Sequence, residues 1–221
     1  MSMERTVKVT GKAKIAVRPD RIRLMITAKG EKVSYEEALG QSAEQAKLLW
    51  ECFEGLGFQR SDLKTVSFQV HTKYENCKEK GNWKQKFVGY EFRQELKIEF
   101  GVDNQMLAKI LHGLAHSTVE PEFHIVYTVK DEESVKNHLL GKAVEDAKTK
   151  AQVLTEAAGV KLGKMISIDY SWEEMEIVSR PMGRMMALAA SGDAVADTCE
   201  VDVEPEDISV SDHVTVVWGI E

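Results

Sequence analysis

Alternation of apolar and polar side chains along the first thirty residues constrains the fold more than any other feature of the chain. Odd positions in residues 7–17 are apolar or small, while the even positions in 8–14 carry Lys or Thr. A period of two places alternate side chains on one face of a β-strand. The pattern returns over 22–28, after Pro19-Asp20, a pair typical of turns. We therefore predict two strands joined as an N-terminal hairpin.

Three helices are indicated by capping residues that precede apolar positions at helical spacing. Ser34 and Glu37 form a capping box, in which each side chain can bond the other residue's backbone, ahead of a helix expected over 35–55. Asp103 and Asp131 can cap the two helices that follow. The last of these carries small alanines on one stripe, which would let it approach a sheet or another helix closely.

Five further strands are expected from apolar alternation, and the last of them ends the chain. They cover residues 66–70, 90–100, 123–129, 166–170 and 214–218. The resulting order is β-β-α-β-β-α-β-α-β-loop-β, in which adjacent strands can form hairpins. We predict an α+β fold of two layers, with largely antiparallel sheets and three main helices. Residues 1–221 are expected to form a single domain, either undivided or as two interlocked α+β lobes.

Two segments interrupt the periodic pattern. Residues 72–87 are polar and are predicted to form a protruding hairpin tip. Residues 171–207 have no clear period, and long segments of this kind are usually functional or disordered. We expect a flexible or interaction loop there. The segment groups Arg and Met residues, and both types are enriched in the cores of interfaces. The candidate interaction residues are Arg180, Met182, Arg184, Met185 and Met186.

Charge and cysteine content limit the partners and the compartment. The formal net charge of −7 argues against a nucleic-acid partner, since such binding depends on Lys and Arg neutralising phosphates. No stretch approaches the roughly 20 apolar residues of a membrane helix, and no signal peptide is visible. Cys52, Cys77 and Cys199 are odd in number and widely spaced, which favours free thiols. A cytoplasmic location without a membrane span is therefore expected.

Several local strings, taken in order, carry a resemblance to a known family. They are GKAKIAVRPD at 11–20, LKT at 63–65, GY at 89–90, AVEDAKTKAQVLTEAAGVKLG at 143–163 and ISVSDHVTVVW at 208–218. With these strings, nearly the whole chain resembles the SIMPL domain family. The resemblance implies a two-layer α+β fold, no established enzymatic reaction and no catalytic motif. It also implies that members are often exported, and that some form large homo-oligomers or are linked to oxidative stress tolerance.

Histidines four residues apart on the second helix are the candidates for a metal site. His112 and His116 would share one helix face, as zinc ligands do, and His124 could add a third ligand. Gly113 stands where a metalloprotease would have a Glu as general base. We interpret these residues as surface histidines and predict no metal and no cofactor, because a metal site needs three or four ligands with supporting contacts.

Catalytic motifs are missing from the chain, which sets the functional hypothesis. There is no G-x-S-x-G elbow, no phosphate-binding loop and no G-x-G-x-x-G fingerprint. We predict a non-enzymatic scaffold or interaction protein that acts as a homo-oligomer; a stress role is implied by the resemblance alone. Two alternatives stay open. One is a small-molecule or metal binding module that uses the helix histidines or the loop methionines, and the other is an uncharacterised enzyme.

Overall fold

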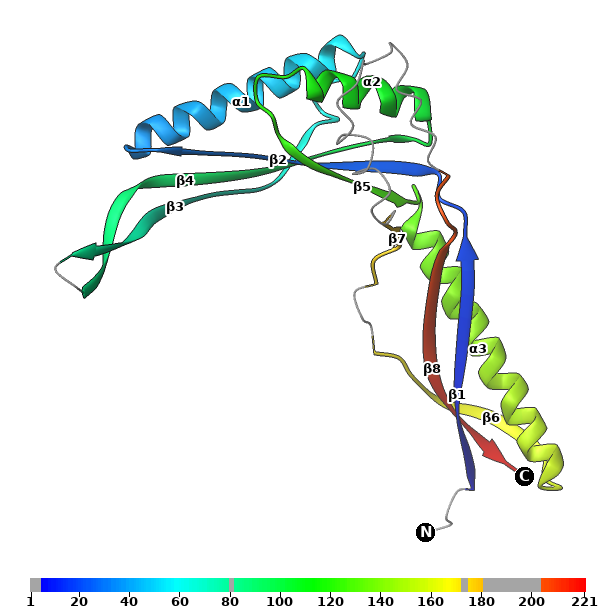
Figure 1. The fold of residues 1–221 in the computed structure, drawn as a ribbon. Coiled ribbons are helices and arrows are strands. Elements are labelled where there is room, and N and C mark those ends of the chain that lie inside the picture. Colours follow the sequence, from blue (N-terminus) through cyan, green and yellow to red (C-terminus); the bar gives the residue numbers. More distant parts are fainter. Residues whose placement is uncertain (1–4, 80–81, 172–174, 181–203) are drawn as a thin grey trace. The chain divides into compact units, whose positions relative to one another are not determined.

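A computed structural model describes residues 5–79, 82–171, 175–180 and 204–221, and it shows an α+β fold with antiparallel sheets (Figure 1). This confirms the predicted fold class. The described residues divide into two compact units. The first unit consists of the described residues within Met1–Pro19, Thr128–Ser179 and Glu206–Glu221. The second unit consists of the described residues within Asp20–Tyr127 and Arg180–Pro205.

The first unit is a three-stranded antiparallel sheet covered by one long helix. Its strands are β1 (Thr6–Val17), β8 (Ile208–Ile220) and β6 (Leu162–Asp169), in the order β1-β8-β6. Helix α3 (Glu132–Ala157) buries its alanine stripe against this sheet, as the spacing of its alanines predicts. The apolar core consists mainly of side chains from these elements, among them Val9, Ala143, Ala147, Val216 and Trp218.

Helix α3 lies very close to β1 at Gly11. A Cβ atom built on Gly11 would lie 2.0 Å from the carbonyl oxygen of Ala143 and 2.7 Å from the Cβ of Ala147. The helix can therefore rest on this strand only because Gly11 has no side chain and the facing helix positions are alanines.

The outer edge of β1 is covered by two charged side chains of α3. The carboxylate of Asp146 accepts a hydrogen bond from the backbone N–H of Lys12 at 2.7 Å. Lys150 donates to the same carboxylate at 2.6 Å and lies 3.5 Å from the carbonyl oxygen of Thr10. An edge strand offers unpaired N–H and C=O groups to other chains, and this arrangement satisfies two of them, at Lys12 and Thr10.

Acidification should remove the contribution of this contact to stability. The hydrogen bond from Lys150, followed by that from the Lys12 backbone, lowers the pKa of Asp146. The ionised Asp146 carboxylate therefore stabilises the folded state fully when the pH is above the ordinary aspartate pKa of about 3.9. This stabilisation is lost as the pH falls through the lower pKa of Asp146 in the folded protein. We expect Asp146→Asn to melt below the wild type at pH 6 and the difference to shrink as the pH falls below the ordinary aspartate pKa. A difference that persists at low pH would contradict the assignment.

The second unit carries most of a five-stranded sheet of order β3-β4-β2-β5-β7 and two helices. Its elements are β2 (Arg21–Lys32), α1 (Tyr35–Gly55), β3 (Lys64–Glu79), β4 (Asn82–Gly101), α2 (Asn104–Ala115) and β5 (Glu122–Thr128). The remaining strand, β7, is Val178–Ser179. Both helices bury their apolar stripes in one core with the sheet, around Leu49, Phe53, Leu107 and Ile110.

Helix boundaries follow the capping residues. Ser34 and Glu37 form both hydrogen bonds of the capping box at the start of α1, which covers the predicted residues 35–55. Asp103 accepts hydrogen bonds from the N–H groups of Gln105 and Met106 in α2, and Asp131 accepts one from Ser134 in α3. These contacts are local in sequence, so the residue pattern identifies them.

The predicted N-terminal hairpin is wrong, although both of its strands exist. β1 pairs antiparallel with β8 along its whole length, and β2 pairs with β4. Pro19 ends the first segment of the first unit, and Asp20 begins the second unit. Alternation identifies a strand and its buried face, but the choice of partner depends on which strands complete the core, and β8 lies about two hundred residues away.

Candidate interaction surface

Strands β3 and β4 continue beyond the rest of their sheet as a two-stranded ribbon. The pairing of β2 with β4 ends at Lys32 and Tyr90, whereas β3 and β4 pair on to Glu79 and Asn82 (Figure 1). We call residues 73–79 and 82–89 the arm. An isolated two-stranded hairpin is at best marginally stable in water, so a ribbon of this length gains from further contacts.

One face of the arm is aromatic. Tyr74 lies opposite Phe87, and Trp83 lies opposite Lys78 in the same alternating register. Their side chains are 53% exposed for Tyr74, 71% for Trp83 and 43% for Phe87. We call these three residues the aromatic face. The other face carries the pair of Glu75 with Lys86 and the pair of Cys77 with Lys84. Asn76, Gln85 and Lys78 share the face with the three rings, so the exposed aromatic side chains lie among polar ones.

A chain of ring contacts connects the arm to the start of α1. The ring centroids are 5.8 Å apart for Tyr74 and Phe87, 5.4 Å for Phe87 and Tyr90, and 5.5 Å for Tyr90 and Tyr35, all edge to face. Each such pair contributes about 0.5–1.5 kcal/mol beyond its buried area. These contacts favour a defined position of the aromatic face on its own unit.

The base of the arm is held by a charged pair and a close backbone approach. Lys73 donates a hydrogen bond to the carboxylate of Glu31 on β2, which raises the pKa of Lys73. Gly89 has φ +152°, and a Cβ there would lie 2.4 Å from the carbonyl oxygen of Lys32. Glycine is required at this position because a side chain would collide with the β2 backbone.

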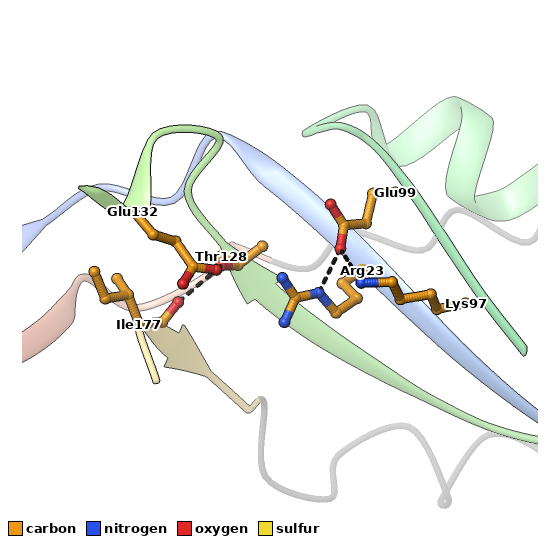
Figure 2. A network of polar contacts seen from close by, with 6 residues as sticks. All are labelled: Arg23, Lys97, Glu99, Thr128, Glu132 and Ile177. Carbon is orange, nitrogen blue, oxygen red and sulfur yellow. Dashed lines mark hydrogen bonds and ion pairs between the residues drawn. The ribbon is translucent and has the colours of Figure 1, made fainter. Parts of the chain in front are cut away.

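The polar face of the second unit's sheet carries ion pairs rather than acid–base groups. Glu99 accepts a hydrogen bond from Arg23 at 2.7 Å and lies 3.5 Å from Lys97 (Figure 2). Burial alone would raise the pKa of Glu99, but Arg23 and Lys97 hold it below its ordinary value. Lys29 likewise lowers the pKa of Glu122. Carboxylates held in the charged form are poorly suited to act as general acids near neutral pH.

Part of the segment expected to form an interaction loop belongs to the core of the first unit. Ile177 is fully buried, and Met175 packs against the same cluster. The hydroxyl of Thr128 donates to the carbonyl oxygen of Ile177 at 2.8 Å and lies 3.4 Å from the Glu132 carboxylate (Figure 2). These contacts anchor residues 175–179 in the first unit.

The remaining candidate interaction residues fall largely outside the described part of the chain. Arg180 is described and exposed at the end of β7. The described residues do not include Met182, Arg184, Met185 and Met186. Their assignment to an interface stays a prediction. Of the three cysteines, Cys52 and Cys77 are free thiols, and Cys199 also lies outside the described residues.

The two helix histidines stack on each other instead of converging on a ligand position. The rings of His112 and His116 are 4.2 Å apart between centroids. His116 is the C-cap of α2, and its Nδ1 donates to the carbonyl oxygen of His112 at 2.8 Å. Within the described ranges, no group of three or more His, Cys, Asp or Glu side chains is placed to hold a metal ion. The expectation of no metal stays a prediction.

The sequence reading missed the aromatic face, although a signal was present. Residues 72–87 are polar on average, and this average conceals Tyr74, Trp83 and Phe87. Once the hairpin register is known, these three side chains fall on one face. A search for aromatics at cross-strand spacing on either side of the Glu79–Asn82 pair could have found them.

These features define an α+β protein of two antiparallel sheets with an exposed aromatic arm. The chain belongs to the SIMPL family, whose family model, described as "Protein of unknown function (DUF541)", matches residues 7–218. It is similar to the "26 kDa periplasmic immunogenic protein" of Brucella melitensis and to that of Brucella abortus. Each is 24% identical over 192 residues, which cover 86% of this chain and 76% of the relative.

The expected cytoplasmic location is wrong in the light of these relatives. Both carry the word periplasmic in their names. The expectation rested on a missing leader pattern and an odd cysteine count, neither of which identifies the final compartment of a chain. Among the described residues, no helix has both the length and the apolar character needed to cross a bilayer.

Proposed function

We propose that this chain is a non-enzymatic interaction protein that assembles with copies of itself outside the cytoplasm and uses the aromatic face of the arm as a subunit contact. The observation that carries the proposal is the exposure of Tyr74, Trp83 and Phe87 on a two-stranded ribbon. Aromatic residues are enriched at protein interfaces, and Trp and Tyr dominate binding hot spots. The periplasmic names of the two relatives support the location.

The charge of the arm favours a second copy as the partner. In the sequence, residues 73–89 contain five Lys and two Glu, while the chain as a whole carries a formal charge of −7. A basic arm on an acidic protein is complementary to the surface of another copy, and such complementarity steers association. A role in oxidative stress tolerance belongs to the proposal through the family resemblance alone.

The described carboxylates give an enzymatic alternative little support. Those with shifted pKa values, Glu99, Glu122 and Asp146, are all lowered by cationic partners. Active sites usually raise the pKa of a catalytic carboxyl group or place it beside a base in a cleft. The arm, by contrast, has three exposed aromatic side chains that an interface would explain.

Loss of the aromatic face should reduce assembly without unfolding the chain. We expect the triple variant Tyr74→Ser, Trp83→Ser, Phe87→Ser to sediment as a smaller species than the wild type at the same concentration. The physical reason is the loss of the apolar area that the contact would bury. Sedimentation velocity measures the assembly, and far-UV circular dichroism measures the fold of the remaining chain.

A conservative variant provides the matched control for this experiment. Tyr74→Phe with Trp83→Phe keeps the aromatic surface and should leave assembly close to that of the wild type. A wild-type chain that is monomeric at tens of micromolar would contradict the proposal. So would a triple variant that assembles normally, and the binding-module alternative would then take its place.

A further inference from the structure

The two edges of the first unit's sheet are treated in opposite ways. Asp146 and Lys150 bind the N–H of Lys12 and the carbonyl oxygen of Thr10 on the outer edge of β1. In the described part of the chain, β6 pairs with no strand other than β8, so its other edge is open. Every side chain from Lys164 to Asp169 is exposed, with Met165 at 55% and Ile166 and Ile168 at 47% each. An open apolar edge strand is a template for pairing with another chain.

The strand register shows which backbone groups point outward from β6. The N–H of Lys12 faces Asp146, away from β8, so His213, the partner of Lys12, directs its backbone groups toward β6. Backbone groups of successive residues in a strand point to opposite sides. Val217 and Thr215 therefore also face β6, while Trp218 and Val216 face β1. Val217 pairs with Ser167 and Thr215 with Asp169, so these two β6 residues direct their backbone groups to β8. Trp218 pairs with Met165, and Val216 pairs with Ile168. Met165 and Ile168 consequently direct their backbone groups to the open edge.

A bulge makes this open edge unusual. The register shifts between Met165 and Ser167, so the two outward-facing residues are three positions apart instead of two. A regular strand cannot match this spacing at both positions. A second β6 running in the opposite direction has the same spacing and matches it, with Met165 opposite Ile168 at both ends.

The side chains are self-complementary in the same register. When Met165 lies opposite Ile168 of a second copy, Lys164 lies opposite Asp169 and Ile166 opposite Ser167. Both ends of the pairing then bring opposite charges together, and the pair next to each end joins the apolar side chains of Met165 and Ile168. Within the described part of the chain, neither Lys164 nor Asp169 has an ion-pair partner. Opposite charges and apolar residues directly across two strands stabilise a sheet.

We propose that β6 pairs antiparallel with β6 of a second copy, about a twofold axis between Ile166 and Ser167. The pairing joins two three-stranded sheets into one sheet of six strands and makes the interface isologous. It rests on the proposed homo-oligomeric function, but it uses a surface separate from the arm. Assembly through two different surfaces would extend beyond a dimer.

Charge reversal tests the register directly. Lys164→Glu alone and Asp169→Lys alone each place like charges together at both ends of the pairing, so each should weaken dimerisation about tenfold or more. The double variant Lys164→Glu, Asp169→Lys restores both pairs and should regain the wild-type affinity. The measurement is the dimer dissociation constant from sedimentation equilibrium. Single variants that dimerise normally, or a double variant that is not rescued, would overturn the pairing.

Disulfide trapping separates this proposal from that of the arm. In a background with all three cysteines changed to Ser, a Met165→Cys chain and an Ile168→Cys chain are coexpressed with different tags. We expect oxidation to link the two different chains, and neither chain to link to itself. Equal self-linking, or no link in the mixture, would contradict the twofold register.

Combination with the arm variant shows which proposal fails. When Tyr74→Ser, Trp83→Ser, Phe87→Ser is added to both chains, the mixed disulfide should still form although the assembly is smaller. A mixed disulfide with no effect of the arm variant on assembly would reject the arm contact and keep the β6 pairing. A smaller assembly with no mixed disulfide before or after the arm substitution would reject the β6 pairing and keep the arm contact.

Discussion

Gly11→Val is expected to destabilise the first unit by about 3 kcal/mol or more. The added Cβ would lie 2.0 Å from the carbonyl oxygen of Ala143 and 2.6 Å from the backbone nitrogen of Ala147. Both atoms belong to the backbone of α3, so no side-chain rotation can relieve the overlap. The helix must move away from β1, and the buried contacts of Ala143 and Ala147 are lost with it.

A second glycine supplies the control for this variant. Gly141 lies in α3, and a Cβ there would meet no atom within 4 Å. Gly141→Ala should therefore stabilise the chain by about 0.5–1 kcal/mol, because alanine loses less backbone entropy in a helix. Urea denaturation followed by far-UV circular dichroism measures both changes. Equal effects of the two substitutions would show that the close approach at Gly11 is not decisive.

Gly11 illustrates what the sequence could and could not reveal about the fold. Alternation identified β1, and the alanine stripe of α3 indicated a close approach to a sheet or helix. Neither pattern indicated that these two elements contact each other, because Gly11 and Ala143 are separated by most of the chain. The same reason explains why the pairing of β1 with β8 was missed. Contacts within a few residues, such as the three helix caps, were predicted correctly.

The candidate interaction surface shows the same limit in a different way. The aromatic face depends on the register between β3 and β4, which places Tyr74 opposite Phe87. The open edge of β6 depends on strand order and on a bulge, neither of which leaves a clear pattern in the residues. Sequence reasoning directed attention to the segment after Ser171, and there the structure places Ile177 in the core of the first unit.

Phe53→Ala is expected to cost the second unit about 3–5 kcal/mol. Phe53 lies on the buried face of α1 with no exposed surface. Its ring meets Phe58 edge to face at 5.9 Å, and Phe58 meets Phe100 of β4 at the same distance. Removal of the ring deletes one end of this series and leaves a cavity between helix and sheet that the surrounding elements can fill only in part.

An exposed phenylalanine of the same unit isolates the effect of burial. Phe68 on β3 is 45% exposed, so Phe68→Ala removes the same atoms from a site in contact with water and should cost much less. The unfolding free energies of the two variants, from urea titration followed by circular dichroism, give the comparison. Similar losses for both would mean that Phe68 is covered in the assembled protein. That result would place β3, the outer strand of its sheet, in a subunit contact beside the arm. Measurement at two protein concentrations distinguishes this case, because only a loss that arises from a contact between copies depends on concentration.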